Sequence, residues 1–152
     1  MTNQMTNPQI GMLGVHLVAA ELIRRGFTVS PTSRDAVGAD LLATDALCQK
    51  AWSVQVKTTA IRPTGWWIVN KQAETTFSDS HVYVFVKFEN DQPVFLVVPS
   101  KTVAKHVQQR GKFRAFYRSD AGTIGWKDFG KTDRLTLPFK RQPRVVSPAL
   151  TG

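Results

Sequence analysis

The chain has 152 residues, of which 42% are hydrophobic and 20% charged, so it is long enough to bury a core and too apolar to be a disordered chain. Its formal net charge is +9 at pH 7, and residues 81–152, with 13 basic and 5 acidic side chains, carry +8 of it. This excess favours a polyanionic partner, nucleic acid before an anionic membrane; the plainer alternative is a soluble basic surface. The single cysteine, Cys48, excludes an internal disulfide and a cysteine-based zinc site. No apolar run reaches the roughly 20 residues that span a bilayer, and the N-terminus lacks the order of a signal peptide, so we expect a cytoplasmic protein without a membrane partner.

The first predicted element is a helix over residues 8–25, where apolar side chains recur at helical spacing. Asn7 is expected to be its N-cap and Pro8 its first residue. Two arginines complement the carbonyl end of the helix, and Gly26 is suited to end it.

Three strands are predicted next, at residues 27–30, 39–43 and 52–58, of which the third alternates strictly between apolar and polar side chains. A turn around residues 47–50 would pair the second and third strands antiparallel. Side chains two positions apart on a strand then share a face of the sheet.

The second half continues with a short strand at residues 66–69 and a helix or loop at residues 70–77. A hairpin is predicted from strands at residues 81–88 and 94–98, because both alternate and a polar turn separates them. A second helix is expected to begin at Ser100 as its cap and to end at a glycine eleven residues later.

The order of these elements indicates an α+β plan around a mixed sheet. Residues 112–130 are aromatic and broken by glycines, which is typical of a further strand pair or of an extension that contacts a partner. We expect a single domain over residues 1–130, and a basic, proline-containing arm or disordered tail over residues 131–152.

Three polar residues stand at strand positions that otherwise favour apolar side chains. Asp40 begins the second strand, while Gln55 and Lys57 lie two apart on the third and therefore project from one face. The antiparallel pairing would bring Asp40 beside the other two. The plainer interpretations are a strand-start carboxylate that caps backbone amides, and an exposed polar strand face.

A carboxylate, an amide and a lysine on adjacent strands are suited to phosphodiester cleavage. Mg²⁺, or Mn²⁺ in its place, takes oxygen ligands and keeps waters and substrate phosphate in its shell, so Asp40 and Gln55 could supply part of that shell. Lys57 could orient or deprotonate the attacking water, or neutralise the charge that develops on the phosphate.

These residues stand within a longer pattern that resembles the PD-(D/E)XK nuclease superfamily, and in particular its small Holliday-junction resolvases and compact homing endonucleases. The resemblance covers about residues 10–100 and is carried by Gly11-x-x-Gly14, Leu22-Ile-Arg-Arg-Gly-Phe27, Ser33-Arg34, Gly38-Ala-Asp40-Leu-Leu and Val54-Gln-Val-Lys57-Thr. It implies a restriction-endonuclease-like αβββαβ core, an α/β three-layer arrangement with a mixed central sheet flanked by helices.

The resemblance also implies Mg²⁺-dependent DNA cleavage, usually by an oligomer. Asp40 matches the metal-binding aspartate of the family, Gln55 its second acidic position and Lys57 its lysine. The chain departs from the pattern twice: Gln55 lacks the negative charge of Glu or Asp, and Val15 stands where many relatives place a helix glutamate. Glu21 faces another side of that helix, and His16 is a poor Mg²⁺ ligand.

The DNA contacts are expected mainly from the basic second half. Residues 99–118 hold six basic side chains and no acidic one, with aromatic residues between them. The candidate nucleic-acid-binding residues are Arg34, Arg110, Lys112, Arg114 and Arg118. Of the adjacent Trp66 and Trp67, burial in a core or interface is favoured over stacking on bases.

The sequence therefore predicts a metal-dependent endodeoxyribonuclease that hydrolyses branched or site-specific duplex DNA, with DNA as its partner. Cutting both strands would need a homodimer or higher homo-oligomer, because one domain of this size contacts only part of a duplex. Two alternatives remain: a catalytically degenerate DNA-binding module and a protein-interaction subunit on the same scaffold.

Overall fold

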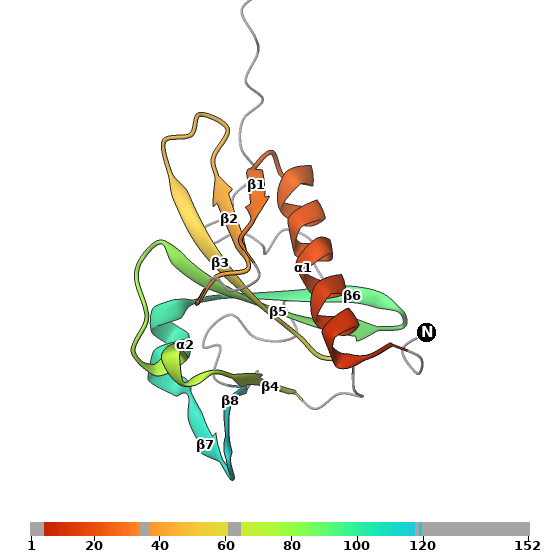
Figure 1. Cartoon of the computed structure of the whole chain (residues 1–152), viewed down its shortest axis with the longest axis vertical. Helices are drawn as coiled ribbons and strands as arrows, with labels where there is room; N and C mark the ends of the chain where they lie inside the picture. The colour runs from red at the N-terminus through yellow and green to blue at the C-terminus, as the bar shows by residue number, and fades with distance from the viewer. Residues whose placement is uncertain (1–4, 34–36, 61–64, 118, 120–152) are drawn as a thin grey trace, which may run out of the picture.

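The computed structural model describes residues 5–33, 37–60, 65–117 and 119. The candidate residues Arg34 and Arg118, and the arm over residues 131–152, lie outside them. Along the described residues (Figure 1) the elements are α1 (Asn7–Arg24), β1 (Thr28–Pro31), β2 (Leu41–Thr44), β3 (Ala51–Thr58), β4 (Trp66–Val69), the 3-10 turn η2 (Lys71–Glu74), β5 (His81–Glu89), β6 (Gln92–Pro99), α2 (Ser100–His106), β7 (Gln108–Arg110) and β8 (Phe113–Tyr117).

Helix α1 begins one residue earlier than predicted, with Thr6 and not Asn7 as its N-cap. The Gln9 side chain accepts a hydrogen bond from the Thr6 backbone N–H at 2.8 Å, while Gln9 N–H donates to the Thr6 hydroxyl. This reciprocal pair satisfies two donors at the helix start, which Asn7 alone could not do. At the other end Gly26 has φ +90°, as expected for the residue that ends a helix.

The main sheet has the strand order β1-β2-β3-β5-β6. Its pairs are antiparallel except β3 with β5, which are parallel and are joined through β4 and η2. The turn between β2 and β3 is closed by the Asp45 carboxylate, which accepts hydrogen bonds from the backbone of Gln49 and Lys50. The sheet is therefore mixed, with the predicted antiparallel pairing of β2 and β3.

The two faces of this sheet bury separate cores. Helix α1 covers the face formed by β1, β2 and β3, where Val18 and Leu22 pack against Leu41, Val54 and other buried side chains. The opposite face of β5 and β6 is covered by α2 and by a second sheet of order β4-β8-β7. Figure 1 shows this small sheet and α2 on the far side of the main sheet from α1.

The hairpin between β5 and β6 turns through Asn90 and Asp91, which both have positive φ, as a tight two-residue turn requires. Helix α2 differs from the prediction at both ends. Ser100 does not cap it: its hydroxyl donates to Ser78 O at 2.9 Å and accepts from Ser78 N–H. The helix ends at His106 because Val107 is extended and leads directly into β7.

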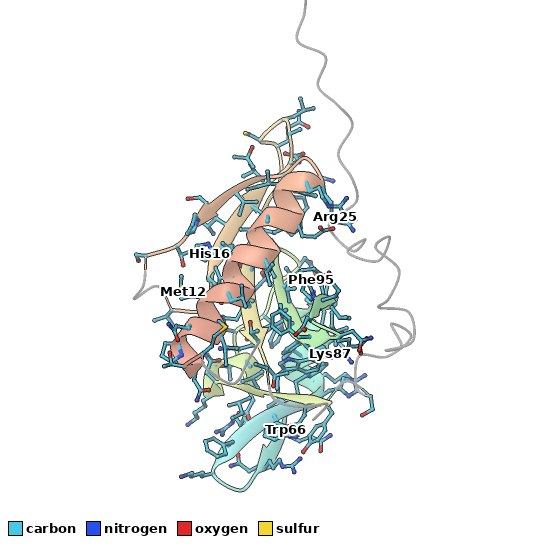
Figure 2. The ribbon with its side chains drawn as sticks, turned by 90° about the vertical axis from the view of Figure 1, so that its right-hand side faces the viewer. Met12, His16, Arg25, Trp66, Lys87 and Phe95 are labelled. Carbon is cyan, nitrogen blue, oxygen red and sulfur yellow. The ribbon has the colours of Figure 1, made fainter. Side chains whose placement is uncertain are left out.

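The described residues thus form an α+β fold, two helices on a mixed five-stranded sheet, in the order predicted. On α1, Met12 and His16 lie on the exposed face of the helix (Figure 2). Neither helix among the described residues has the length and apolar character needed to cross a membrane.

Candidate active site

Asp40 is held at the entrance of β2 by hydrogen bonds to the neighbouring strand. Its backbone N–H donates to Val54 O at 2.8 Å, which sets the register in which Leu41 lies opposite Val54. One carboxylate oxygen, Oδ2, accepts a hydrogen bond from Val56 N–H at 2.7 Å and another from the Gln55 side-chain amide. Because both donors come from β3, the carboxylate is fixed against that strand.

Gln55 is 7% exposed, and its amide nitrogen is oriented by the bond to Asp40. Its amide oxygen is left on the other side of the carboxamide group, as the planar geometry requires. Tyr83 lies beside Gln55 on β5, and burial raises the pKa of the Tyr83 hydroxyl above its ordinary value. Asp40 and Gln55 are thus brought together, as the strand pairing predicted.

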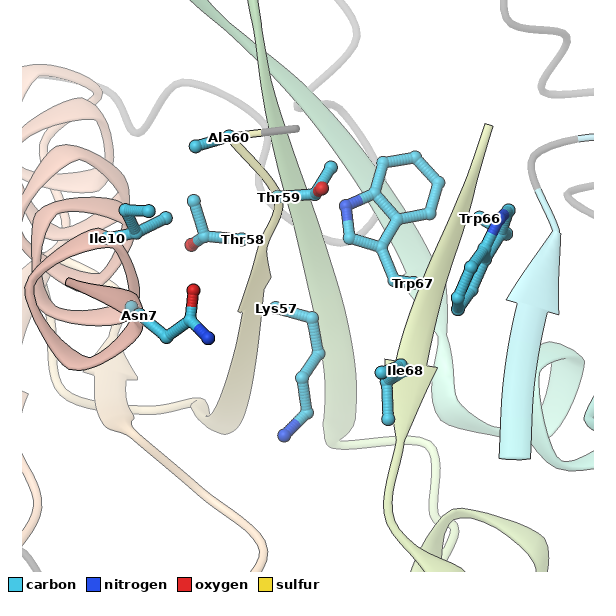
Figure 3. A pocket seen from close by; sticks show the side chains of 10 residues that line it. Asn7, Ile10, Lys57, Thr58, Thr59, Ala60, Trp66, Trp67 and Ile68 are labelled. Carbon is cyan, nitrogen blue, oxygen red and sulfur yellow. The ribbon is translucent and has the colours of Figure 1, made fainter. Parts of the chain in front are cut away.

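Lys57 lies two residues beyond Gln55 on the same face of β3 and lines a pocket of about 260 Å³. The pocket opens between the start of α1, the end of β3 and β4 (Figure 3), where the Lys57 side chain extends between Asn7 and Ile68. Its lining residues are Asn7, Ile10, Gly11, Lys57, Thr58, Thr59, Ala60, Trp66, Trp67 and Ile68.

The pocket residues on α1 and β4 are not evident from the sequence. Asn7 was expected to be a cap, and Ile68 to be an ordinary strand residue. Asn7 lines the pocket with Lys57 because α1 packs on β3, and Ile68 does so because β4 lies beside β3. No local pattern marks such a long-range neighbour, since the three segments are far apart in the chain.

The donor set matches a hard divalent cation in kind, though not in charge. Asp40 Oδ1 and Gln55 Oε1 take no part in the hydrogen bonds that Asp40 accepts from Gln55 and Val56. Oxygen is the ligand type that Mg²⁺ and Mn²⁺ take. Within the described residues no group of three or more His, Cys, Asp or Glu side chains lies close enough to hold a metal. The residues therefore fit a cation that keeps several waters and is held by one carboxylate charge.

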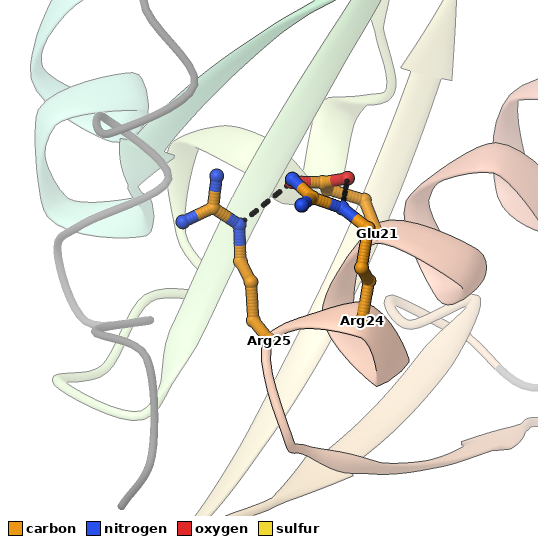
Figure 4. A network of polar contacts seen from close by, with 3 residues as sticks. All are labelled: Glu21, Arg24 and Arg25. Atoms are coloured by element: carbon orange, nitrogen blue, oxygen red, sulfur yellow. Dashed lines mark hydrogen bonds and ion pairs between the residues drawn. The ribbon is translucent and has the colours of Figure 1, made fainter.

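Helix α1 adds no carboxylate to this set. Val15 is part of the core beneath the helix. Glu21, the helix's single acidic residue, is bound by Arg24 Nη2 at 2.7 Å and by Arg25 Nε at 2.8 Å (Figure 4). The hydrogen bond from Arg24, helped by Arg25 and opposed by burial, holds the pKa of Glu21 below its ordinary value.

The described candidate DNA-contacting residues gather on the β7–β8 hairpin. The Arg110 guanidinium lies 4.6 Å from the centre of the Trp66 ring and donates to the Tyr117 hydroxyl at 2.9 Å. Lys112 lies at the hairpin turn, 5.4 Å from the Phe113 ring centre. Arg114 differs from them, because Glu74 on η2 accepts its Nε–H and neutralises its charge.

The two adjacent tryptophans have different surroundings. Trp67 is buried, packs 5.0 Å from the centre of the Phe85 ring and donates to Val86 O, as favoured from the sequence. Trp66 points to the other face of β4 and is partly exposed beneath Arg110.

No protein-family model and no curated protein sequence matches this chain. Among solved structures it is similar to a bacterial homing endonuclease, I-Ssp6803I, with 18% identity and a TM-score of 0.56 over 88% of this chain and 91% of the other. It is also similar to Hjc, a Holliday junction resolvase of Archaeoglobus fulgidus, with 13% identity and a TM-score of 0.48 over 73% of this chain and 86% of that one. The chain therefore has the restriction-endonuclease-like nuclease fold, as the sequence pattern indicated.

Proposed function

We propose that this protein is a metal-dependent endodeoxyribonuclease that hydrolyses DNA phosphodiester bonds, in branched or site-specific duplex DNA. The observation that carries the proposal is the pairing of Asp40 with Gln55 across β2 and β3, with Lys57 next on the same face and at the edge of a pocket. The similarity in fold to a homing endonuclease supports it.

In this proposal the Asp40 and Gln55 oxygens hold Mg²⁺ or Mn²⁺, which, when bound, polarises the phosphoryl oxygen and lowers the pKa of a coordinated water. The hydrogen bonds from Gln55 and Val56 fix the carboxylate before DNA arrives, so little reorganisation accompanies binding. Lys57 orients or deprotonates the attacking water, or neutralises charge on the phosphate as the new P–O bond forms and the old one breaks.

The grip on DNA is assigned to the basic second half of the chain. Arg110 and Lys112 carry charge that no described acidic group neutralises, whereas Arg114 would have to exchange Glu74 for a phosphate. Arg34, six residues before Asp40, and Arg118, which follows β8, remain proposed phosphate contacts on sequence grounds.

The direct test is a cleavage assay on linear, nicked and four-way DNA with Mg²⁺, with Mn²⁺ and with chelator. We expect metal-dependent nicking of at least one substrate and none with chelator. Persistent binding of all three substrates without cleavage under either metal would reject the endonuclease proposal.

A second candidate is a DNA-binding module that keeps the scaffold but does not cut. The single carboxylate at the site, and the engagement of Glu21 by two arginines, favour it over the endonuclease. The charges of Arg110 and Lys112 favour it over a purely protein-binding subunit. It predicts DNA affinity that falls steeply with salt and no product under any divalent metal.

For the endonuclease proposal, cutting both strands of a duplex is assigned to a homodimer or higher homo-oligomer.

A further inference from the structure

The outer face of the small sheet is a surface of aromatic and basic side chains. Cross-strand partners share a face, and the register pairs Trp66 with Tyr117 and Arg110 with Phe113, while Ile68 follows two residues after Trp66. Together these five residues form what we call the platform. The alternate positions, Trp67 and Phe116, face the core instead.

Two apolar side chains of the platform, Ile68 and Phe113, are open to solvent. Ile68 and Phe113 are 48% and 45% exposed, unusual for large apolar side chains on adjacent strands of one sheet. The positions of this face within β4, β7 and β8 include no acidic residue, and Lys112 adds a second positive charge at its edge. The partner it suits is therefore anionic and has flat apolar faces.

Arg110 gives the platform a preorganised cation. Its guanidinium is held over the Trp66 ring and by the Tyr117 hydroxyl, both uncharged partners, so its charge and its outer plane remain available. Nucleobases stack on aromatic rings and on guanidinium planes, and their phosphates pair with such cations. A paired duplex hides its base faces, whereas unpaired nucleotides present them.

The platform is continuous with the pocket of Lys57, because Trp66 and Ile68 line that pocket and also belong to the platform. A strand whose phosphate meets Lys57 could thus continue across β4 toward the β7–β8 hairpin. We infer that the platform binds unpaired nucleotides of a DNA strand by stacking, next to the proposed cleavage site. The inference deepens the proposed nuclease function and rests on it for the path of the strand.

The test compares three fluorescently labelled 20-nucleotide ligands in chelator: a single strand, a fully abasic strand of the same length and a duplex. The abasic strand keeps the phosphates and removes the bases. Phe113→Ala is the main variant, and Phe77→Ala is its matched control, because Phe77 is another phenylalanine, 51% exposed, outside the platform. Arg110→Lys keeps the charge but removes the guanidinium plane.

We expect the wild type to bind the base-bearing strand about tenfold or more tightly than the abasic strand, which is the effect of stacking one base. Phe113→Ala should lower the affinity for the base-bearing strand about 5- to 10-fold and leave the affinity for the abasic strand unchanged. Arg110→Lys should reduce the ratio between the two affinities. Phe77→Ala should change neither affinity. Equal binding of the two strands by the wild type would overturn the inference. So would self-association of the protein that Phe113→Ala abolishes, since a second copy would then occupy the face.

The outcome is separable from that of the nuclease proposal because no metal or cleavage enters the measurement. A protein that cuts DNA but does not distinguish bases from abasic phosphates refutes the platform alone. A protein that prefers unpaired bases but never cuts refutes the endonuclease proposal and leaves the platform standing.

Discussion

At Gly14, helix α1 lies close against Thr58 of β3. A Cβ at this position would lie 1.7 Å from Thr58 Oγ1 and 2.9 Å from Thr58 Cβ, so something must move. We predict that Gly14→Ala lowers the free energy of unfolding by about 1–3 kcal/mol through overpacking, as measured by urea denaturation.

Gly11, one helical turn earlier, is the matched control for this change, because a Cβ there would meet nothing within 4 Å. Gly11→Ala should raise stability by up to about 1 kcal/mol, the helix propensity of alanine over glycine. Adding Thr58→Ala to Gly14→Ala should recover part of the loss, since the Thr58 hydroxyl is buried without a hydrogen-bond partner among the described residues. Equal costs for the two glycine variants would contradict the close approach.

Asp40 has a structural and a proposed metal-binding role that two variants separate. Asp40→Asn keeps an oxygen for Val56 N–H but removes the charge, so the fold should persist while the rise in Tm on adding MgCl₂ disappears. Asp40→Ala should in addition cost about 1–3 kcal/mol without metal, because it leaves Val56 N–H unpaired. A Tm of Asp40→Asn that still rises with Mg²⁺ as in the wild type would remove Asp40 from the metal site.

His81 links stability to pH. Burial holds its pKa below the ordinary value of 6.5, and its Nδ1 lies 2.7 Å from Ser53 Oγ. Well above pH 6.5 the imidazole is neutral in both the folded and the unfolded protein, so the stability that neutral His81 contributes is fully present. As the pH falls through 6.5 the unfolded chain takes up the proton first, and this stability is lost.

His81→Gln removes this titration. Urea denaturation from pH 8 to pH 5 should therefore show a wild-type stability that falls more steeply below about pH 6.5 than that of the variant. Parallel curves for the two proteins would mean that His81 titrates alike in the folded and unfolded states.

At the scale of elements, the β7–β8 hairpin carries two basic residues without a described acidic partner, Arg110 and Lys112, and one that is paired with Glu74, Arg114. Arg110→Ala and Lys112→Ala should each lower the slope of log Kd against log[salt] for duplex DNA by about 1. Arg114→Ala should alter the slope less, because Glu74 already neutralises Arg114 in the free protein. Anisotropy titrations at several salt concentrations measure the slopes, and equal effects of all three variants would reject the distinction.

The elements that the sequence predicts best are those with strong local patterns. The alternation in β3 and β5 and the helical spacing in α1 place these elements within about two residues of their observed bounds. The small sheet was less predictable, because β4 pairs with β8 across some 50 residues and neither strand marks its partner. The predicted end of α2 was wrong, because Gly111, which was expected to stop the helix, lies in the turn between β7 and β8.

The parts of the candidate site that depend on local sequence patterns were predictable, and those that depend on distant segments were not. Antiparallel pairing of β2 and β3 follows from local patterns, and it is enough to bring Asp40 to Gln55. The pocket beside Lys57 depends on β4 and on the start of α1, and the pairing of Arg114 with Glu74 depends on where η2 lies. Contacts of this kind come from the tertiary fold and leave no periodic trace in the sequence.

For the molecule as a whole, the two faces of the main sheet differ in composition. Helix α1 closes one face with an apolar core, whereas the strip of Asp40, Gln55 and Lys57 lies on the other face, toward the small sheet. The excess of positive charge, carried by residues 81–152, supports binding of DNA and is silent about cleavage. The claim of cleavage therefore depends on Lys57 and its two neighbours.

The most direct test of that claim is the single-turnover rate of DNA cleavage by Lys57→Ala, with the substrate fully bound. Its matched control is Lys50→Ala, an exposed lysine at the other end of the β2–β3 hairpin. We predict that Lys57→Ala cuts at least about 100-fold more slowly with DNA affinity nearly unchanged, as for loss of a group that assists proton transfer or charge stabilisation, and that Lys50→Ala cuts like the wild type. Cleavage by Lys57→Ala at the rate of the Lys50 variant would contradict the account.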